Sequence, residues 1–151
     1  MGGRYFEDWH VGEKMETRST TLTEDEIVAF AREYDPQPFH LDRAAAEASP
    51  FKALVASGWQ TAAVTMRLIV ESGIFGESGG IGLGVDELRW LKPVYPGDAL
   101  HVVSEVANKR ANPEKRSGIC HFKLATINQN GETVMSHTAI VLVPKRPEVR
   151  A

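Results

Sequence analysis

Apolar residues spaced three or four positions apart predict a helix early in the chain. They recur between Ile27 and Tyr34, which gives a helix one apolar face. Thr23 and Glu26 form a capping-box pattern at its start, in which each side chain binds the backbone N–H of the other residue. Pro36 ends the helix, because proline fixes its own φ and lacks an N–H.

A longer helix is predicted from about Gly58 to Ser72. Its apolar residues run nearly all round, with small residues in its first half, which is typical of a largely buried helix. Between the two helices, Asp42 can cap a short helix through Arg43–Ala48. The first half of the chain is therefore mainly helical.

From Val85 onward, strand-like runs are separated by turn residues, as in an antiparallel sheet. Asn130-Gly131 is a strong hairpin signal between the last two runs. Helices followed by a long meander predict the α+β class, with the helices packed on one face of the sheet. The predicted strands are a short one within Lys14–Thr20 and four longer ones, Val85–Leu91, Ala99–Arg110, Gly118–Asn128 and Thr133–Val143.

The segment Glu77–Gly84 contains four glycines and resembles a phosphate-binding loop only superficially. A P-loop needs a Lys-Ser/Thr pair after the glycines, and a dinucleotide-binding loop opens a helix. Neither feature follows here. We expect a flexible connection that leads into a strand.

Composition indicates one ordinary globular domain over residues 1–151, with 42% hydrophobic and 25% charged residues. The net charge of −3 gives no reason to expect nucleic acid as a partner. Cys120 is the single cysteine, so we expect a reducing, cytoplasmic location. The longest uncharged stretch, Ala53–Met66, is too short to span a bilayer, and the start has no apolar signal region. We therefore expect a soluble protein without membrane association.

Candidate acid–base chemistry lies at the end of the first helix, where Asp35 and His40 are five positions apart. Pro36 and Pro38 bias the residues before them towards extended conformations. We therefore expect a stiff loop that holds a carboxylate and an imidazole in fixed relation, as general acid–base catalysis requires. The alternative is an ordinary proline-rich loop with solvated side chains.

The start of the long helix is a second candidate. A helix N-terminus presents unpaired N–H groups and a partial positive charge, and Gly58 lets a ligand approach the backbone closely. An oxyanion hole for a thioester enolate needs these features. The alternative is that Ser57 only caps the helix and Gly58 only permits the turn.

Three blocks together resemble a known family. Asp35–His40, which reads Asp-Pro-Gln-Pro-Phe-His, resembles the Asp-x-Asn-Pro-x-His signature of the MaoC-like, (R)-specific enoyl-CoA hydratases and dehydratases. The resemblance continues in Ala56–Gly58 and in Leu91–Asp98, and its order and spacing cover residues 5–143. It implies a hotdog fold, in which a long antiparallel sheet wraps around a central helix, and assembly as a homodimer or a dimer of dimers.

The resemblance also implies residue roles. Asp35 would take a proton from water, His40 would hold the same water and pass a proton to Cα, and the Gly58 N–H would polarise the thioester carbonyl. The substrate would be a trans-2-enoyl-CoA, with no metal and no cofactor besides this coenzyme A thioester. Apolar neighbours such as Phe39 favour a raised pKa for Asp35.

The remaining site predictions are Gln37, Ser57 and Trp59, assigned to substrate binding. Gln37 departs from the signature's Asn, and Ser57 stands where His is frequent in the family. Two other functions stay open: a thioesterase on the same fold, and a non-catalytic subunit that binds an acyl thioester. We assign structural or solvated roles to the scattered histidines His10, His101, His121 and His137.

Overall fold

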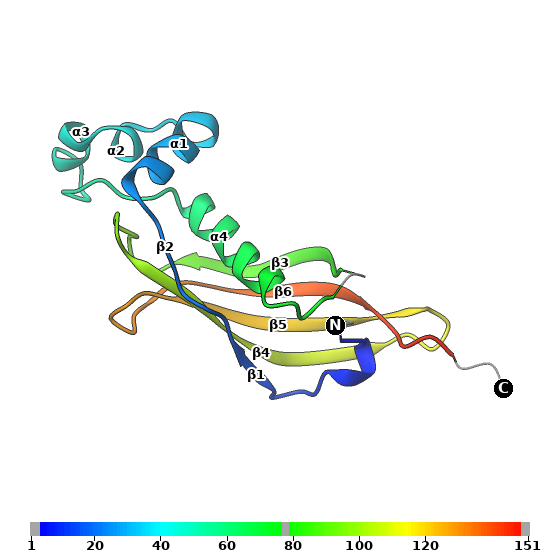
Figure 1. The fold of residues 1–151 in the computed structure, drawn as a ribbon. Helices are drawn as coiled ribbons and strands as arrows, with labels where there is room; N and C mark the ends of the chain where they lie inside the picture. Colours follow the sequence, from blue (N-terminus) through cyan, green and yellow to red (C-terminus); the bar gives the residue numbers. More distant parts are fainter. Residues whose placement is uncertain (1–3, 77–78, 149–151) are drawn as a thin grey trace.

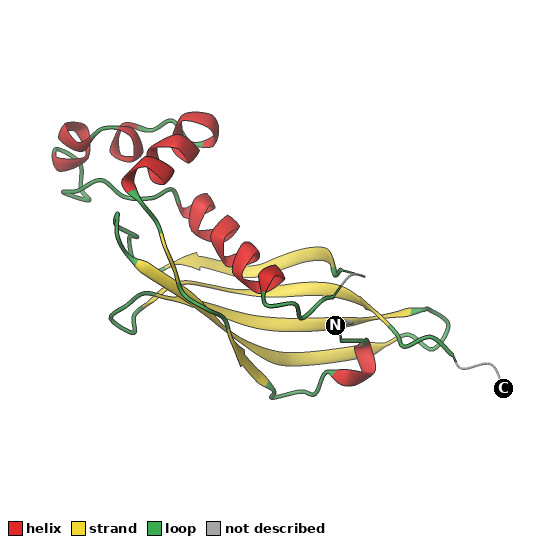
Figure 2. Cartoon of the chain, in the orientation of Figure 1, coloured by secondary structure: helices red, strands yellow, loops and turns green. Residues whose placement is uncertain are grey.

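The structure, a computed structural model that describes residues 4–76 and 79–148, is an antiparallel sheet crossed by one long helix (Figure 1). Helix α4 (Gly58–Glu71) lies along one face of the sheet. Three shorter helices, α1 (Glu24–Tyr34), α2 (Pro38–Leu41) and α3 (Arg43–Glu47), gather beyond one end of it (Figure 2). The predicted α+β class is confirmed.

The six strands pair in the order β1-β4-β5-β6-β3, and β2 also pairs with β4. The turn before β6 contains Gly131 with a φ of +75°, as the predicted hairpin requires. A 3-10 turn, η1 (Phe6–Asp8), precedes the sheet. The strands are β1 (Lys14–Glu16), β2 (Thr20–Thr21), β3 (Ile81–Trp90), β4 (Ala99–Ala111), β5 (Ser117–Ile127) and β6 (Thr133–Pro144).

The strand positions confirm the pattern-based prediction, but the predicted order is wrong at one place. A simple meander would put β3 beside β4, whereas β3 pairs with β6 at the far edge. The short strands β1 and β2 pair with β4 at that position instead. In addition, β3 begins at Ile81, inside the predicted glycine-rich connection. Glu77 and Ser78 of that connection lie outside the described residues.

The main core lies between α4 and the sheet. Alternate β5 residues are buried, including Phe122 and Leu124, and they belong to one cluster with Leu68 and Ile69 of α4. Cys120 is also buried in this cluster, as expected for a small apolar side chain. This packing fixes α4 on the sheet.

One face of α4 is exposed. Trp59, Ala63, Met66 and Val70 recur at helical spacing, and the exposed fractions of Trp59, Met66 and Val70 are 58%, 58% and 55%. The prediction of a largely buried helix is therefore wrong for this face. The reason is geometric, because in a single chain the sheet covers only one side of the helix.

Two backbone hydrogen bonds join the three sequence blocks at the end of the sheet. The Val55 N–H donates to the Phe39 carbonyl at 3.3 Å, and the Ala56 N–H donates to the Val94 carbonyl at 2.8 Å. The segment before α4 is thereby fixed between α2 and the connection that follows β3. Beneath it, a second apolar cluster that includes Ile27 and Leu54 supports this end of the molecule.

Candidate active site

The predicted acid–base pair is formed. Asp35 is the C-cap of α1, and its backbone N–H donates to the Ala31 carbonyl at 2.9 Å. His40 lies in α2, and its Nε2 is 3.2 Å from Asp35 Oδ2. The predicted stiff loop is only partly right, because Pro38 starts a helical turn at its preferred first position. This turn brings the imidazole back to the carboxylate.

Asp35 accepts two further hydrogen bonds. The Gln37 amide donates to Oδ1 and the Ser57 hydroxyl donates to Oδ2, each at 2.7 Å. Burial alone would raise the pKa of Asp35, but these two bonds, together with His40, outweigh it and lower the pKa below the ordinary value. The expected raised pKa is therefore wrong, because the sequence pattern does not reveal the donors around the carboxylate.

The other nitrogen of His40 is also fixed. Nδ1 lies 2.7 Å from the Val55 carbonyl oxygen. A carbonyl only accepts, so Nδ1 carries the proton of this bond. The bond fixes the ring with Nε2 facing Oδ2 of Asp35.

Gly58 starts α4, with Ser57 as its N-cap. An added Cβ at Gly58 would lie 2.5 Å from Cε2 of Trp90, so the close neighbour that requires glycine is this indole ring. Trp90 also donates its Nε1–H to the Gly58 carbonyl at 2.9 Å. Among the described residues, no hydrogen bond occupies the Gly58 N–H, which leaves it available to a ligand.

These residues line a cleft of about 410 Å³ between the α1–α3 end and the connection after β3. Asp35, Gln37, His40, Gly58 and Trp59 all contribute to its wall. Ser57 is fully buried behind them. All six predicted site residues therefore come together at or directly behind one cleft.

Comparison with known proteins identifies the protein family that this chain matches. Residues 7–126 match the model of the MaoC like domain. The chain belongs to the MaoC-like domain family. The family resemblance seen in the sequence and the hotdog fold that it implies are both confirmed.

Similar proteins cover nearly the whole MaoC-like chain. The crystal structure of a MaoC-like dehydratase from Rhodospirillum rubrum is 44% identical, covers 97% of this chain and 100% of its own, and has a TM-score of 0.91. The uncharacterised protein YdeM of Bacillus subtilis is 33% identical over 92% of this chain and 98% of its own length. The (R)-hydratase PhaJ1 of Pseudomonas aeruginosa is 28% identical over 97% of this chain and 92% of its own, with a TM-score of 0.69.

Two contributors to the MaoC-like site lie outside the six predicted site residues. Trp90 forms an edge-to-face pair with Trp59, with ring centroids 5.0 Å apart, and Val55 fixes the His40 ring. Trp90 directly precedes the Leu91–Asp98 block, and this adjacency is the signal that could have drawn attention to it. A backbone acceptor such as the Val55 carbonyl leaves no mark in the residue types.

Neither a metal site nor a membrane span is found in residues 4–76 and 79–148 of this MaoC-like chain. No three His, Cys, Asp or Glu side chains gather there as metal ligands would. No helix in the same residues has the length and apolar character needed to cross a bilayer.

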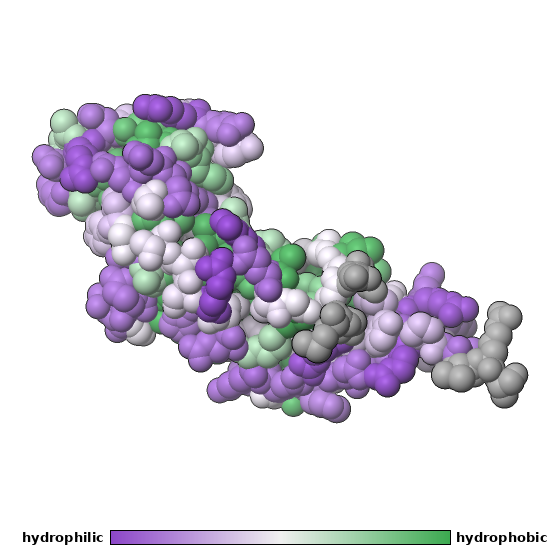
Figure 3. All heavy atoms as spheres, in the orientation of Figure 1, coloured by the Kyte–Doolittle hydropathy of each residue, from purple (hydrophilic) through white to green (hydrophobic). Residues whose placement is uncertain are grey.

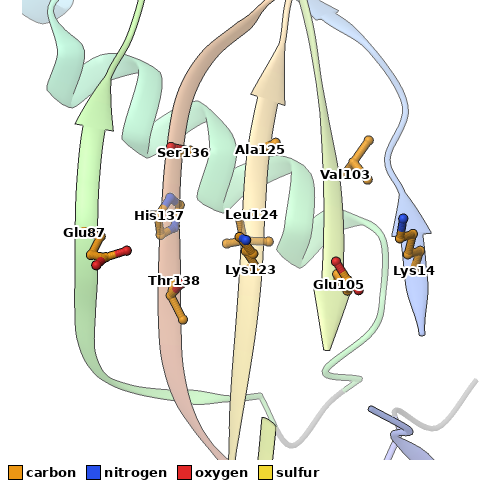
Figure 4. A pocket seen from close by; sticks show the side chains of 10 residues that line it. All are labelled: Lys14, Glu87, Val103, Glu105, Lys123, Leu124, Ala125, Ser136, His137 and Thr138. Carbon is orange, nitrogen blue, oxygen red and sulfur yellow. The ribbon is translucent and has the colours of Figure 1, made fainter. Parts of the chain in front are cut away.

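A second hollow, of about 270 Å³, lies on the face of the sheet away from α4 (Figure 4). Cross-strand neighbours alternate in charge there, with Lys14 beside Glu105 and Glu105 beside Lys123. The hollow contains none of the six predicted site residues. Its alternating charges are typical of a solvated sheet face.

Proposed function

We propose that this protein is a hydro-lyase that adds water to a trans-2-enoyl-CoA to give a (3R)-hydroxyacyl-CoA, or runs the reverse dehydration. The observation that carries the proposal is the Asp35–His40 pair, 3.2 Å apart, in the same cleft as the start of α4. Membership of the MaoC-like family and likeness to a structure titled an (R)-hydratase support it.

In the proposed reaction the pair activates one water molecule. The water oxygen bonds to the β-carbon of the enoyl thioester, and the electron pair of the double bond moves towards the thioester oxygen. One water proton passes to the Asp35 carboxylate, and His40 holds the same water. A proton returned from the pair to Cα completes the addition.

The Gly58 N–H has the proposed role of oxyanion donor. During addition, negative charge develops on the thioester oxygen, and a fixed N–H at a helix start stabilises it more than it stabilises the neutral substrate. Ser57 and Gln37 have a supporting role here, since both donate to Asp35. We therefore assign them to holding the carboxylate, in place of the direct substrate contact expected from the sequence.

A panel of trans-2-enoyl-CoAs tests the proposal. Hydration removes the enoyl absorbance and releases no thiol, whereas the thioesterase alternative releases free coenzyme A. Product chirality is measured in the same reactions. Substrate binding without loss of absorbance or release of thiol would indicate the non-catalytic alternative.

Asp35→Asn and His40→Asn are each expected to lower kcat by at least about a hundredfold, the usual contribution of a general acid or base. Asp25→Asn and His10→Asn make the same chemical changes at exposed positions outside the cleft, and they should leave kcat unchanged. Near-normal hydration by either cleft variant would refute the assignment of the pair.

The proposal includes a homodimer formed through one surface, here called the α4–β3 surface. It consists of the exposed α4 stripe together with apolar residues of the edge strand β3, and part of it is visible in Figure 3 as green side chains. Large exposed apolar patches mark interfaces, and an edge strand offers unpaired backbone groups to a second copy. The surface residues of β3 are Ile81, Leu83, Val85 and Trp90, which are 45–62% exposed.

A further inference from the structure

We propose that the preferred substrate carries a hydroxyl group on its acyl chain, away from the thioester, and that His137 binds this hydroxyl group. This inference rests on the proposed function and names the class of acyl group that the site accepts. It depends on a small cavity between α4 and the sheet that the reaction itself does not use.

Two elements, α4 and β6, contribute residues both to the catalytic cleft and to the cavity. On α4, Thr61 lines the cleft and Thr65, one turn further on, lines the cavity. On β6, Val134 lines the cleft and His137 lines the cavity. Along the helix axis, Gly58 and Thr65 are separated by about 10 Å. An acyl chain that is held at Gly58 and runs along α4 would bring its far end to this cavity.

His137 contributes unused hydrogen-bonding capacity to the cavity. Its Nδ1 is buried and has no hydrogen-bond partner among the residues that the structure describes. Burial lowers the pKa of the imidazole, so the ring is neutral at pH 7. A buried polar atom without a partner is destabilising, and a ligand atom that binds it would remove this deficit.

The other polar side chains in the cavity wall are those of Thr65 and Ser104. The Thr65 hydroxyl is engaged, since it donates to the Thr61 carbonyl at 2.8 Å and lies 2.6 Å from the Thr126 hydroxyl. Ser104 is 3% exposed and also lines the cavity. Ser104 on β4 and His137 on β6 lie on either side of Leu124 on β5, so Ser104 is at the opposite side of the cavity from His137. The rest of the wall is apolar, formed by Met66, Ile69, Ile74, Phe75, Phe122, Leu124, Ala139 and Val141.

This wall selects among the possible ends of an acyl chain. A methyl end would leave Nδ1 of His137 unpaired. A carboxylate end would be buried without a cation, because no Lys or Arg among the described residues lines the cavity, and that is strongly unfavourable. A hydroxyl end can donate or accept, so it matches either tautomer of His137.

The size of the cavity limits what enters it. Its volume of about 40 Å³ is a few times the minimum of about 10–15 Å³ that admits one water molecule, so it accepts the end of a chain and little more. Met66 lines the cavity although its side chain is 58% exposed, so the cavity approaches the surface of α4 at this residue. Methionine is flexible and adapts to a guest. A bound water is the rival occupant.

The test compares three sets of trans-2-enoyl-CoAs of rising chain length, which end in a methyl, a hydroxyl or a carboxylate group. At the best length, kcat/KM for the hydroxyl substrate should exceed that for the methyl substrate by about tenfold, and the carboxylate substrate should be the poorest. His137→Phe should abolish the hydroxyl preference and retain turnover of the methyl substrate. The control is His121→Phe. His121 is next to the buried Phe122 on β5, so its side chain lies on the opposite face of the sheet, and this variant should keep the preference.

Dissociation constants of the saturated acyl-CoAs provide a readout that does not depend on turnover. Tighter binding of the hydroxyl compound to the wild-type protein is expected. Equal binding of the hydroxyl and methyl compounds, or a preference that His137→Phe leaves intact, would overturn the inference and indicate water in the cavity. If the binding preference is present but no enoyl-CoA is hydrated, the proposed function fails and the assignment of His137 stands.

Discussion

Ser57→Ala is the most informative single change, because the Ser57 hydroxyl has two partners. It donates to Asp35 Oδ2 at 2.7 Å and accepts from the Trp59 N–H at 3.2 Å as the N-cap of α4. Loss of an N-cap costs about 1 kcal/mol. Loss of a hydrogen bond to a charged group costs about 1.5–3 kcal/mol. The free energy of unfolding at pH 7 should therefore fall by about 2.5–4 kcal/mol.

The same change should move the titration of Asp35. In the wild-type protein the pKa of Asp35 is below its ordinary value of 3.8, so the stabilisation is present above that pH and is lost as the pH falls through the folded-state pKa. Removing the Ser57 donor while burial persists raises the pKa. Stability, and activity if the proposed mechanism holds, should then decline at a higher pH than in the wild type.

The assay combines urea unfolding across the acid range with a carbon-13 NMR titration of the Asp35 carboxyl group. Thr23→Ala is the matched control, because it removes the N-cap of α1 without touching Asp35. It should lower the free energy of unfolding by about 1 kcal/mol and leave the Asp35 titration unchanged. An unmoved titration in Ser57→Ala, with a stability loss equal to that of Thr23→Ala, would refute the reasoning.

Two other changes test the neighbouring features. Gly58→Ala places a Cβ 2.5 Å from the Trp90 ring. It should therefore lower the free energy of unfolding by about 1–3 kcal/mol, shift the tryptophan fluorescence and reduce the rate of enoyl-CoA hydration. The control Gly84→Ala, whose Cβ meets nothing nearer than 3.9 Å, should have none of these effects. Val85→Lys puts a charge on the α4–β3 surface and should shift the mass measured by light scattering from dimer to monomer. The control Val11→Lys, at an exposed position on another part of the chain, should leave the mass unchanged. A wild-type protein that is monomeric at all concentrations would contradict the proposed dimer.

Local signals in the sequence were sufficient for most of the fold. The capping box of Thr23 and Glu26 is present with both reciprocal hydrogen bonds, because its residues lie within one helical turn. The Asn130-Gly131 hairpin is local in the same way. The position of β3 was not predictable by this means, since its pairing with β6 joins Ile81 to Leu142 across most of the second half of the chain.

The candidate site likewise contains contacts within one short segment, which were predictable, and contacts between distant residues, which were not. The pairing of Asp35 with His40 is encoded within six residues, and its existence was predictable. The lowered pKa of Asp35 was not, because one of its donors, Ser57, comes from 22 positions away. The contact between Trp90 and Gly58 was not predictable for the same reason, since it spans 32 positions. Periodicity reports which face of an element is apolar and cannot report what covers that face.

The role of α4 has a consequence for how this chain tolerates insertions and deletions. One residue added within Gly58–Glu71 would rotate everything beyond it by about 100°. Thr65 and Leu68 would then turn away from the sheet, while Gly58 stayed in place at the helix start. Length variation among relatives should therefore be confined to surface turns such as residues 112–116, where an added residue disturbs no register.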